Sequence, residues 1–185
     1  SIKIQKISQK YGALAPFLRP KKFAKDNSSD FDVVKHFLNF YKLYINKKID
    51  FLVYLRPTLP IRPNNIVDKS INKLKKNSNY TSLRTVKLIN EHPYWTFKIL
   101  HKKLVPFMKN FNQINYFRRQ MLPKVYRATG TVDIINVSLY NLKNRNLYGG
   151  SVLSLIDKSR FVDIDSKNDL EEIEKLIKSK KINLF

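Results

Sequence analysis

Two aspartates near the carboxyl terminus, Asp163 and Asp165, are the residues of this 185-residue chain best placed to hold a cation. We expect them to end a short strand over residues 160–164, where positions i and i+2 point to the same face. Two such carboxylates suit Mg²⁺, which prefers oxygen ligands and shares its shell with substrate phosphates. The same acidic stretch also fits the start of a helix, with Ser166 and Asp169 as a variant capping box. From spacing alone, the capping interpretation is the better one.

Two arginine-bearing segments could recognise a carboxylate or a phosphate. The first, YLRPTLPIR, carries Arg56 and Arg62 on a proline-stiffened loop, and a guanidinium binds such anions bidentately. The second, FRRQMLPKVYRATG, places Arg119 beside Gln120, and a nucleic-acid surface has much the same composition. Loop arginines are more often solvated, so neither segment is specific alone. No metal-ligand spacing relates the three histidines, His36, His92 and His101.

The elements that must position these residues alternate between strand and helix. Apolar residues at helical spacing predict helices over residues 1–10, 31–45, 66–74 and 168–180. A nearly continuous apolar run predicts a strand over residues 49–55. Further strands are expected over residues 13–18, 80–88 and 131–137. This alternation implies right-handed crossovers and a mainly parallel sheet, whose ligands bind beyond the carboxyl ends of the strands. The loop that carries Arg56 leaves one of those ends.

The segment over residues 91–122 breaks this rhythm. It is rich in aromatic and basic residues, has weak periodicity, and contains Pro93 and Pro106, which break any long helix. It could form a projecting hairpin, a dimer arm or a nucleic-acid surface.

Composition excludes several classes of protein. Hydrophobic residues make up 43% of the chain, which argues against disorder, and the absence of cysteine excludes disulfides, thiolate zinc sites and a thiol nucleophile. No run is long enough to span a bilayer, so we expect a cytoplasmic protein without a membrane partner. The net charge of +22 fits a polyanion partner, but A/T-rich codons for Lys, Asn and Ile explain it as well. The basic residues are spread along the whole chain, which favours the codon explanation.

Taken in order, five segments resemble the acylneuraminate cytidylyltransferase family, whose members make CMP-sialic, CMP-legionaminic and CMP-pseudaminic acids. They are KYGALAPFLRPKKFAKD, YLRPTLPIR, RRQMLPKVYRATGTVDIINV, LYGG and FVDIDSKNDLEEIEKLI. Each is modest alone, but five in the right order and spacing across nearly the whole chain make a strong resemblance.

The resemblance implies a Rossmann-like, three-layer α/β nucleotidyltransferase fold with a mainly parallel sheet. Residues 1–185 would form a single domain, with residues 91–122 as a projecting dimerisation insertion, and the chain would be a homodimer. The implied reaction transfers CMP from CTP to a sialic-acid-like nonulosonic acid, releases pyrophosphate, and uses Mg²⁺. The alternative from charge is a basic nucleic-acid-binding protein, which the carboxylate pair argues against, so we expect no nucleic-acid partner.

The resemblance also assigns roles to particular residues. Asp163 and Asp165 would be the metal ligands and catalytic residues, which overrides the capping interpretation. The other five would contact substrates: Arg19 and Ser28 the nucleotide, and Arg56, Arg119 and Gln120 the sugar acid.

Several positions depart from the family pattern. Arg56 stands where many sialic-acid enzymes have glutamine, Asp133 stands where a tyrosine is common, and Ala-Thr-Gly at residues 128–130 replaces an asparagine-glycine pair. These changes point away from sialic acid and towards legionaminic or pseudaminic acid.

The family's opening segment, with its "ARgGSK" phosphate loop and a second strand ending in "STD", has no counterpart near Ser1. We therefore expect a sheet without its N-terminal strands, an unpaired edge at residues 49–55, and neither tight CTP binding nor turnover by the chain as given. We further expect weak solubility or partial unfolding, unless another chain supplies the missing strands.

Overall fold

The computed structural model describes residues 1–108, 118–140, 145–159 and 163–179. Its centre is a four-stranded sheet in the order β1 (Phe51–Tyr54), β5 (Tyr126–Asn136), β2 (Ser82–Leu88) and β6 (Val152–Ile156). Strand β5 is antiparallel to both β1 and β2, whereas β6 is parallel to β2. Three of the four strands therefore run in one direction, and the expected mainly parallel sheet is confirmed.

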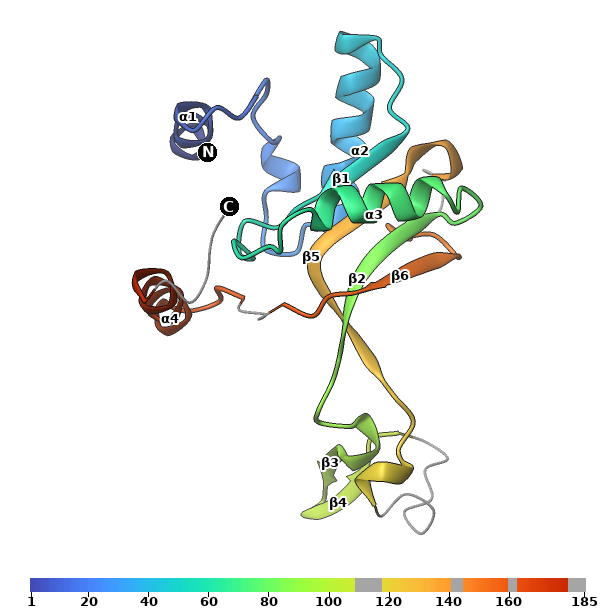
Figure 1. The fold of residues 1–185 in the computed structure, drawn as a ribbon. Coiled ribbons are helices and arrows are strands. Elements are labelled where there is room, and N and C mark those ends of the chain that lie inside the picture. Colours follow the sequence, from blue (N-terminus) through green and yellow to red (C-terminus); the bar gives the residue numbers. More distant parts are fainter. Residues whose placement is uncertain (109–117, 141–144, 160–162, 180–185) are drawn as a thin grey trace.

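Helices cover both faces of this sheet, as the three-layer expectation requires (Figure 1). Helix α2 (Asp30–Phe40) packs Phe31 and Val34 against Leu52 and Ile135. On the other face, α3 (Ile66–Lys75) packs Leu74 into a second buried cluster. The two clusters draw on alternate residues of the same strands, because successive side chains of a strand point to opposite faces.

The remaining helices lie outside these two clusters. Helix α1 (Ile2–Lys10) buries none of its residues, and α4 (Lys167–Lys178) buries Ile173 and Leu176. Helix α2 continues into a π-helical turn, Tyr41–Ile45, and Asn46 ends it in the left-handed conformation. None of the helices in the described ranges is long and apolar enough to cross a bilayer.

A separate two-stranded hairpin projects from the sheet. Strands β2 and β5 continue past a register shift near Thr85 as a crossing ribbon. At the far end of that ribbon, β3 (Phe97–Leu100) pairs with β4 (Lys103–Pro106) (Figure 1). The hairpin falls inside the segment that breaks the strand–helix rhythm.

Most of the predicted elements are present, one predicted strand is absent, and one observed strand was not predicted. The strand expected over residues 13–18 is an irregular segment in which Leu14 is 97% exposed, because an apolar run becomes a strand only where a neighbour pairs with it. Strand β6 was not predicted. Of the strand expected over residues 160–164, the first three residues lie outside the described ranges, and Asp163 and Ile164 belong to no strand.

Candidate functional site

The loop that follows β1 is tied to β5 by one arginine. Arg62 donates through Nε to the carbonyl of Thr131 at 3.1 Å and through Nη2 to the carbonyl of Arg56 at 2.7 Å. Burial lowers the pKa of Arg62. Leu59, at the tip of the loop, is buried. The bonds of Arg62 shape the loop, so its guanidinium acts as a brace rather than as an exposed anion receptor.

Arg56, the other arginine of this loop, lies at the centre of a charged cluster. It donates to Asp133 at 2.7 Å, and to Asp30 and the hydroxyl of Tyr148 at 3.1 Å each. Burial alone would lower the pKa of Arg56, but the hydrogen bonds to Asp133 and Tyr148 outweigh it and hold this pKa above its ordinary value. Gly130, with a φ of +72°, leaves room for the guanidinium, since a Cβ there would meet Arg56 Nη1 at 3.1 Å.

Asp133 is the buried anion of this cluster. Its side chain is fully buried in the middle of β5. Besides Arg56, it accepts from Arg84 Nε at 3.2 Å and from the Tyr148 hydroxyl at 2.8 Å. Two guanidinium groups therefore compensate one buried carboxylate, as a buried charge requires.

Two tyrosines form the apolar walls of the cluster. Arg84 stacks over the ring of Tyr148 at 3.9 Å, and Arg56 lies 5.0 Å from the ring of Tyr54. Burial and then the hydrogen bond to Asp30 raise the pKa of Tyr54 to about 12, so this phenol stays a donor at neutral pH. Burial also raises the pKa of Tyr148.

Tyr148 belongs to the LYGG segment, and the start of β2 holds this segment in place. The hydroxyls of Thr81 and Ser82 both donate to the Tyr148 carbonyl, at 2.8 and 2.7 Å. Gly149 has a φ of +75°, and a Cβ there would come within 2.6 Å of Thr81. Only glycine fits this close approach.

Of the two residues expected along the nucleotide, Ser28 lies near the amino end of α2. Ser28 precedes the helix and accepts a hydrogen bond from the backbone of Lys25 at 3.0 Å. The positive charge of Arg19 partly offsets the raised pKa of Tyr54.

Asp163 lies beside the loop after β1. The N–H of the next residue, Ile164, donates to the carbonyl of Thr58 at 2.9 Å. Asp163 is half-buried, and its Oδ1 atom is buried without a hydrogen-bond partner among the described residues. A buried carboxylate oxygen without a partner is costly unless something binds it.

Asp165 takes part in the start of α4. Its N–H donates to Asp169 at 3.1 Å, and Ser166 and Asp169 form the expected capping box. The hydrogen bonds from Ser166 lower the pKa of Asp169. Since neither Asp163 nor Asp165 is in a strand, the proposed same-face geometry is wrong, although the two remain close in the chain.

The residues present fit a magnesium ion. The described part of the chain contains no cluster of three or more potential ligands. Mg²⁺ is nevertheless commonly held by one or two carboxylates together with substrate phosphates, and the unpartnered oxygen of Asp163 suits such a site.

Arg119 and Gln120 lie far from Arg56 within one chain. They belong to the short turn Arg119–Met121 on the projecting part, where Arg119 donates to Asn90 at 3.2 Å (Figure 1). Strand β5 leads from this part of the chain to the charged cluster. Because a strand rises about 3.3 Å per residue, Tyr126 at its start and Asp133 beside Arg56 are roughly 23 Å apart. The expectation that both residues face the same ligand as Arg56 is therefore not met within one chain.

Comparison with known proteins finds relatives over nearly the whole chain. No family model matches the chain. It is 27% identical over 184 residues to the post-translational flagellin modification protein B of Campylobacter coli, a match that covers 98% of this chain and 76% of that protein. It is 26% identical to the N-acylneuraminate cytidylyltransferase of Escherichia coli O18:K1:H7 (strain RS218 / NMEC), covering 96% of this chain and 43% of that protein.

A solved structure supports the same assignment at the level of the fold. CMP:2-keto-3-deoxy-manno-octonic acid synthetase complexed with CTP superimposes with a TM-score of 0.65 at 12% identity, covering 97% of this chain and 78% of that one. The sequence matches and the fold agree with each other, and they bear out the resemblance inferred from the five segments: over nearly its whole length the chain is similar to a cytidylyltransferase in sequence and to a CTP-bound synthetase in fold.

Proposed function

We propose that this chain is a CTP-dependent nucleotidyltransferase that transfers CMP to a sialic-acid-like nonulosonic acid. A hydroxyl of the acid attacks the α-phosphorus of CTP, the bond from that phosphorus to the bridging oxygen breaks, and pyrophosphate leaves. The observation that carries the proposal is the position of Asp163, whose unpartnered oxygen lies by the loop at the carboxyl end of β1. Open α/β sheets bind their ligands at such ends.

The chain's own residues would act mainly by positioning. Asp163 and Asp165 would hold Mg²⁺, which when bound would neutralise charge on the phosphates. Arg19 and Ser28 would lie along the nucleotide, with Ser28 just before the amino end of α2. Phosphoryl transfer needs little else from a protein than alignment and charge neutralisation.

The sugar acid would meet Arg56 through an exchange of ion pairs. Of the two carboxylates on Arg56, Asp133 is fully buried, whereas the side chain of Asp30 is 46% exposed. A carboxylate of the substrate can therefore replace Asp30 without disturbing Asp133. This exchange makes a guanidinium that is already paired available to an acidic sugar.

The test is CMP transfer with a panel of acids. The chain is incubated with CTP, Mg²⁺ and in turn sialic, legionaminic and pseudaminic acid, both alone and with the part of the Campylobacter coli relative that lies outside its match. We expect pyrophosphate release from the mixture and not from the chain alone, and we expect this release to depend on the acid, with legionaminic or pseudaminic acid preferred. No release from a mixture in which the two polypeptides demonstrably bind would contradict the proposal.

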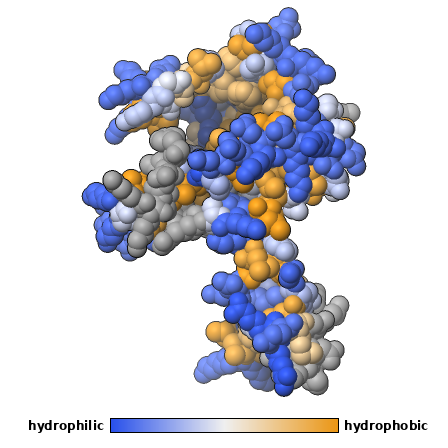
Figure 2. Space-filling model, viewed as in Figure 1, coloured by the Kyte–Doolittle hydropathy of each residue, from blue (hydrophilic) through white to orange (hydrophobic). Residues whose placement is uncertain are grey.

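A homodimer built through residues 91–122 is part of the same proposal. Ile99 and Leu104 face each other on the β3–β4 hairpin and are 74% and 69% exposed, and Figure 2 shows apolar residues at the surface of the projecting part. An isolated two-stranded hairpin is only marginally stable, so this face needs a cover. In such a dimer, Arg119 and Gln120 of one chain would lie next to the other chain.

We expect a dimer by light scattering at micromolar concentration, and replacement of both Ile99 and Leu104 by lysine should convert it to a monomer. The double replacement of Val152 and Ile156 by lysine on β6, where the two side chains are 43% and 51% exposed, serves as the control. A monomeric mass for the unaltered chain would count against the dimer.

A further inference from the structure

Asp157 is a buried carboxylate that the proposed mechanism does not use. Among the acidic residues in the described ranges, only Asp133 and Asp157 are buried, and Asp157 is 2% exposed. Two guanidinium groups compensate Asp133, whereas the partners of Asp157 in the same ranges are two hydroxyls and one N–H. Because a buried carboxylate is costly to keep, the groups that it binds indicate what it holds in place.

One oxygen of this carboxylate ties the end of β6 to β5. Asp157 directly follows β6, and its N–H donates to the carbonyl of Val86 on β2 at 2.8 Å. Its Oδ2 accepts from the hydroxyl of Thr131 on β5 at 2.7 Å. Strand β2 lies between β5 and β6, so this hydrogen bond spans the middle strand, beside the register shift near Thr85.

The other oxygen shapes the chain beyond β6. Oδ1 of Asp157 accepts from the N–H of Ser159 at 2.9 Å and from the hydroxyl of Ser159 at 2.6 Å, the way in which aspartates commonly fix a turn. Lys87 on β2 donates to the carbonyl of Ser159 at 3.1 Å. Ser159 is therefore held by three of its polar groups, four positions before Asp163.

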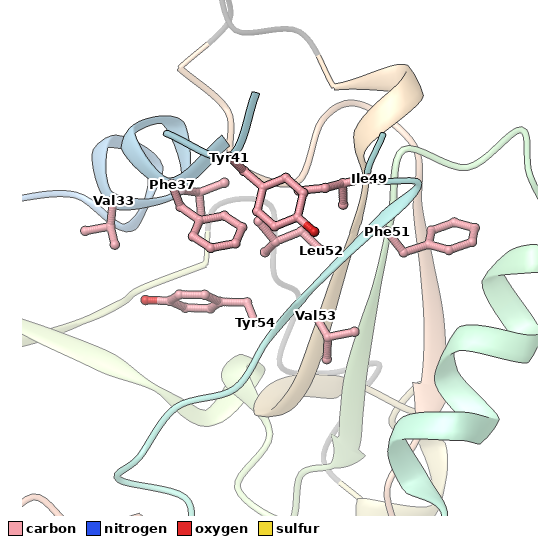
Figure 3. A pocket seen from close by; sticks show the side chains of 9 residues that line it. Val33, Phe37, Tyr41, Ile49, Phe51, Leu52, Val53 and Tyr54 are labelled. Carbon is pink, nitrogen blue, oxygen red and sulfur yellow. The ribbon is translucent and has the colours of Figure 1, made fainter. Parts of the chain in front are cut away.

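The loop after β1 holds the chain again at Ile164, whose N–H donates to the carbonyl of Thr58 at 2.9 Å. This loop leaves a well-packed strand. Figure 3 shows Leu52 and Tyr54 of β1 on the same side as the ring of Phe37, and all three belong to the apolar cluster against α2. The loop thus offers the segment a second fixed point, directly after the aspartate expected to hold the metal.

Thr131 joins the two points of attachment. Its hydroxyl donates to Asp157, and its carbonyl accepts from Arg62 of the loop at 3.1 Å. We propose that Asp157 is a positioning residue: by anchoring the end of β6 to Thr131, it sets where the carboxylate of Asp163 lies and so where Mg²⁺ binds. This role rests on the proposed function, in which Asp163 holds the metal.

A displaced carboxylate matters at such a site because Mg²⁺ demands near-ideal octahedral geometry and takes only one or two carboxylates from the protein. Loss of a residue that orients a metal ligand typically lowers metal affinity or activity by about 10–100-fold. The anchor of Asp157 should therefore affect the metal more than the stability of the fold.

The test compares two ways of cutting the anchor with one that preserves it. Asp157→Ala removes the carboxylate, and Thr131→Val removes its hydroxyl partner. Asp157→Asn keeps the shape of the side chain, and the Thr131 hydroxyl can then accept from the new amide and donate to Thr129, whose Oγ1 lies 3.0 Å away. Ser70→Ala is the control, because it loses a buried hydrogen bond to the carbonyl of Ile66 on α3, away from the anchor.

The first measurement is hydrogen exchange in the chain without metal or substrate. In Asp157→Ala and Thr131→Val, the amide of Ile164 should exchange about tenfold faster than in the unaltered chain, through a local opening. In Asp157→Asn and Ser70→Ala, this amide should keep its protection relative to the amides of the β2–β5 ladder. Circular dichroism reports whether each variant is folded. Unchanged exchange at Ile164 in both anchor variants, or exchange in Asp157→Asn as fast as in Asp157→Ala, would overturn the proposal.

The second measurement is the Mg²⁺ concentration that half-maximally raises the melting temperature in the presence of CTP. Asp157→Ala and Thr131→Val should need about tenfold more Mg²⁺, whereas Asp157→Asn and Ser70→Ala should match the unaltered chain. A merely structural role would lower the melting temperature without moving this concentration, and that result would also overturn the proposal.

The two measurements separate this inference from the proposed function. If no sample responds to Mg²⁺ or transfers CMP while exchange at Ile164 still distinguishes the variants, the proposed function fails and the anchor stands. Full CMP transfer by the two anchor variants at the ordinary Mg²⁺ concentration would do the reverse.

Discussion

Replacement of Asp133 by alanine should lower the free energy of unfolding by about 3–5 kcal/mol, the range seen when one partner of a buried ion pair is removed. Asp133 is fully buried and accepts hydrogen bonds from Arg56, Arg84 and Tyr148. Its removal leaves two partly buried guanidinium groups with no shared counter-charge. It also leaves a tyrosine hydroxyl without its acceptor.

Urea unfolding followed by circular dichroism measures this loss. Asp50→Ala is the matched control, because Asp50 pairs with Lys48 at 3.6 Å while both side chains are at least 70% exposed. An exposed pair of this kind contributes about 0–1 kcal/mol. A loss for Asp133→Ala that is no larger than the loss for Asp50→Ala would show that the cluster does not stabilise the fold.

Arg56 and Asp133 should also be energetically coupled. These are two of the positions at which the sequence departs from the family pattern, and the structure brings them into contact at 2.7 Å. In a double-mutant cycle of Arg56→Gln and Asp133→Asn, we expect the two losses to be clearly non-additive, as they are for residues in one network. Relative to the family pattern, Arg56 in place of glutamine and Asp133 in place of tyrosine would then be two coupled replacements that form one ion pair, rather than two independent changes.

The predictable part of the fold is the part with a strong local pattern. Helices α2, α3 and α4 have apolar residues at helical spacing, α2 and α4 also have clear amino-terminal signals, and β1 is a continuous apolar run. Strand β6 was missed because its sequence, VLSLI, is short and its pairing with β2 is set by tertiary context. An apolar run alone predicted a strand over residues 13–18, where no neighbour pairs.

The candidate site was predictable only in part. The position of Arg56 at the carboxyl end of β1 follows from the order of the elements, but its pairing with residues 26 and 77 positions away does not. One local signal was present: an aspartate within the apolar run TVDIIN must be paired if the run is buried. Arg84 and Tyr148 could not be recognised as its partners, because only the register of the sheet brings them there.

Asp163→Asn should reduce CMP transfer about 100-fold or more, which is the loss of a few kcal/mol that a catalytic metal contributes. The measurement uses whichever sample shows acid-dependent pyrophosphate release, either the chain alone or the chain with the unmatched part of the Campylobacter coli relative. Asparagine keeps the shape of the side chain and removes its negative charge, and the buried Oδ1 of the aspartate has no hydrogen-bond partner among the described residues. Stability in the absence of Mg²⁺ should therefore change by less than about 0.5 kcal/mol.

Asp165→Asn should likewise reduce transfer, because a hard cation prefers a charged oxygen over an amide. For both variants we expect weaker stabilisation by Mg²⁺ in the presence of CTP, followed by thermal unfolding, so that the metal is tested apart from turnover. Asp169→Ala is the control: loss of its bonds to Ser166 should cost about 1 kcal/mol of stability, the usual cost of a lost helix cap, and leave the response to Mg²⁺ unchanged. Full transfer and an unaltered Mg²⁺ response in both Asp163→Asn and Asp165→Asn would mean that these aspartates only shape the start of α4.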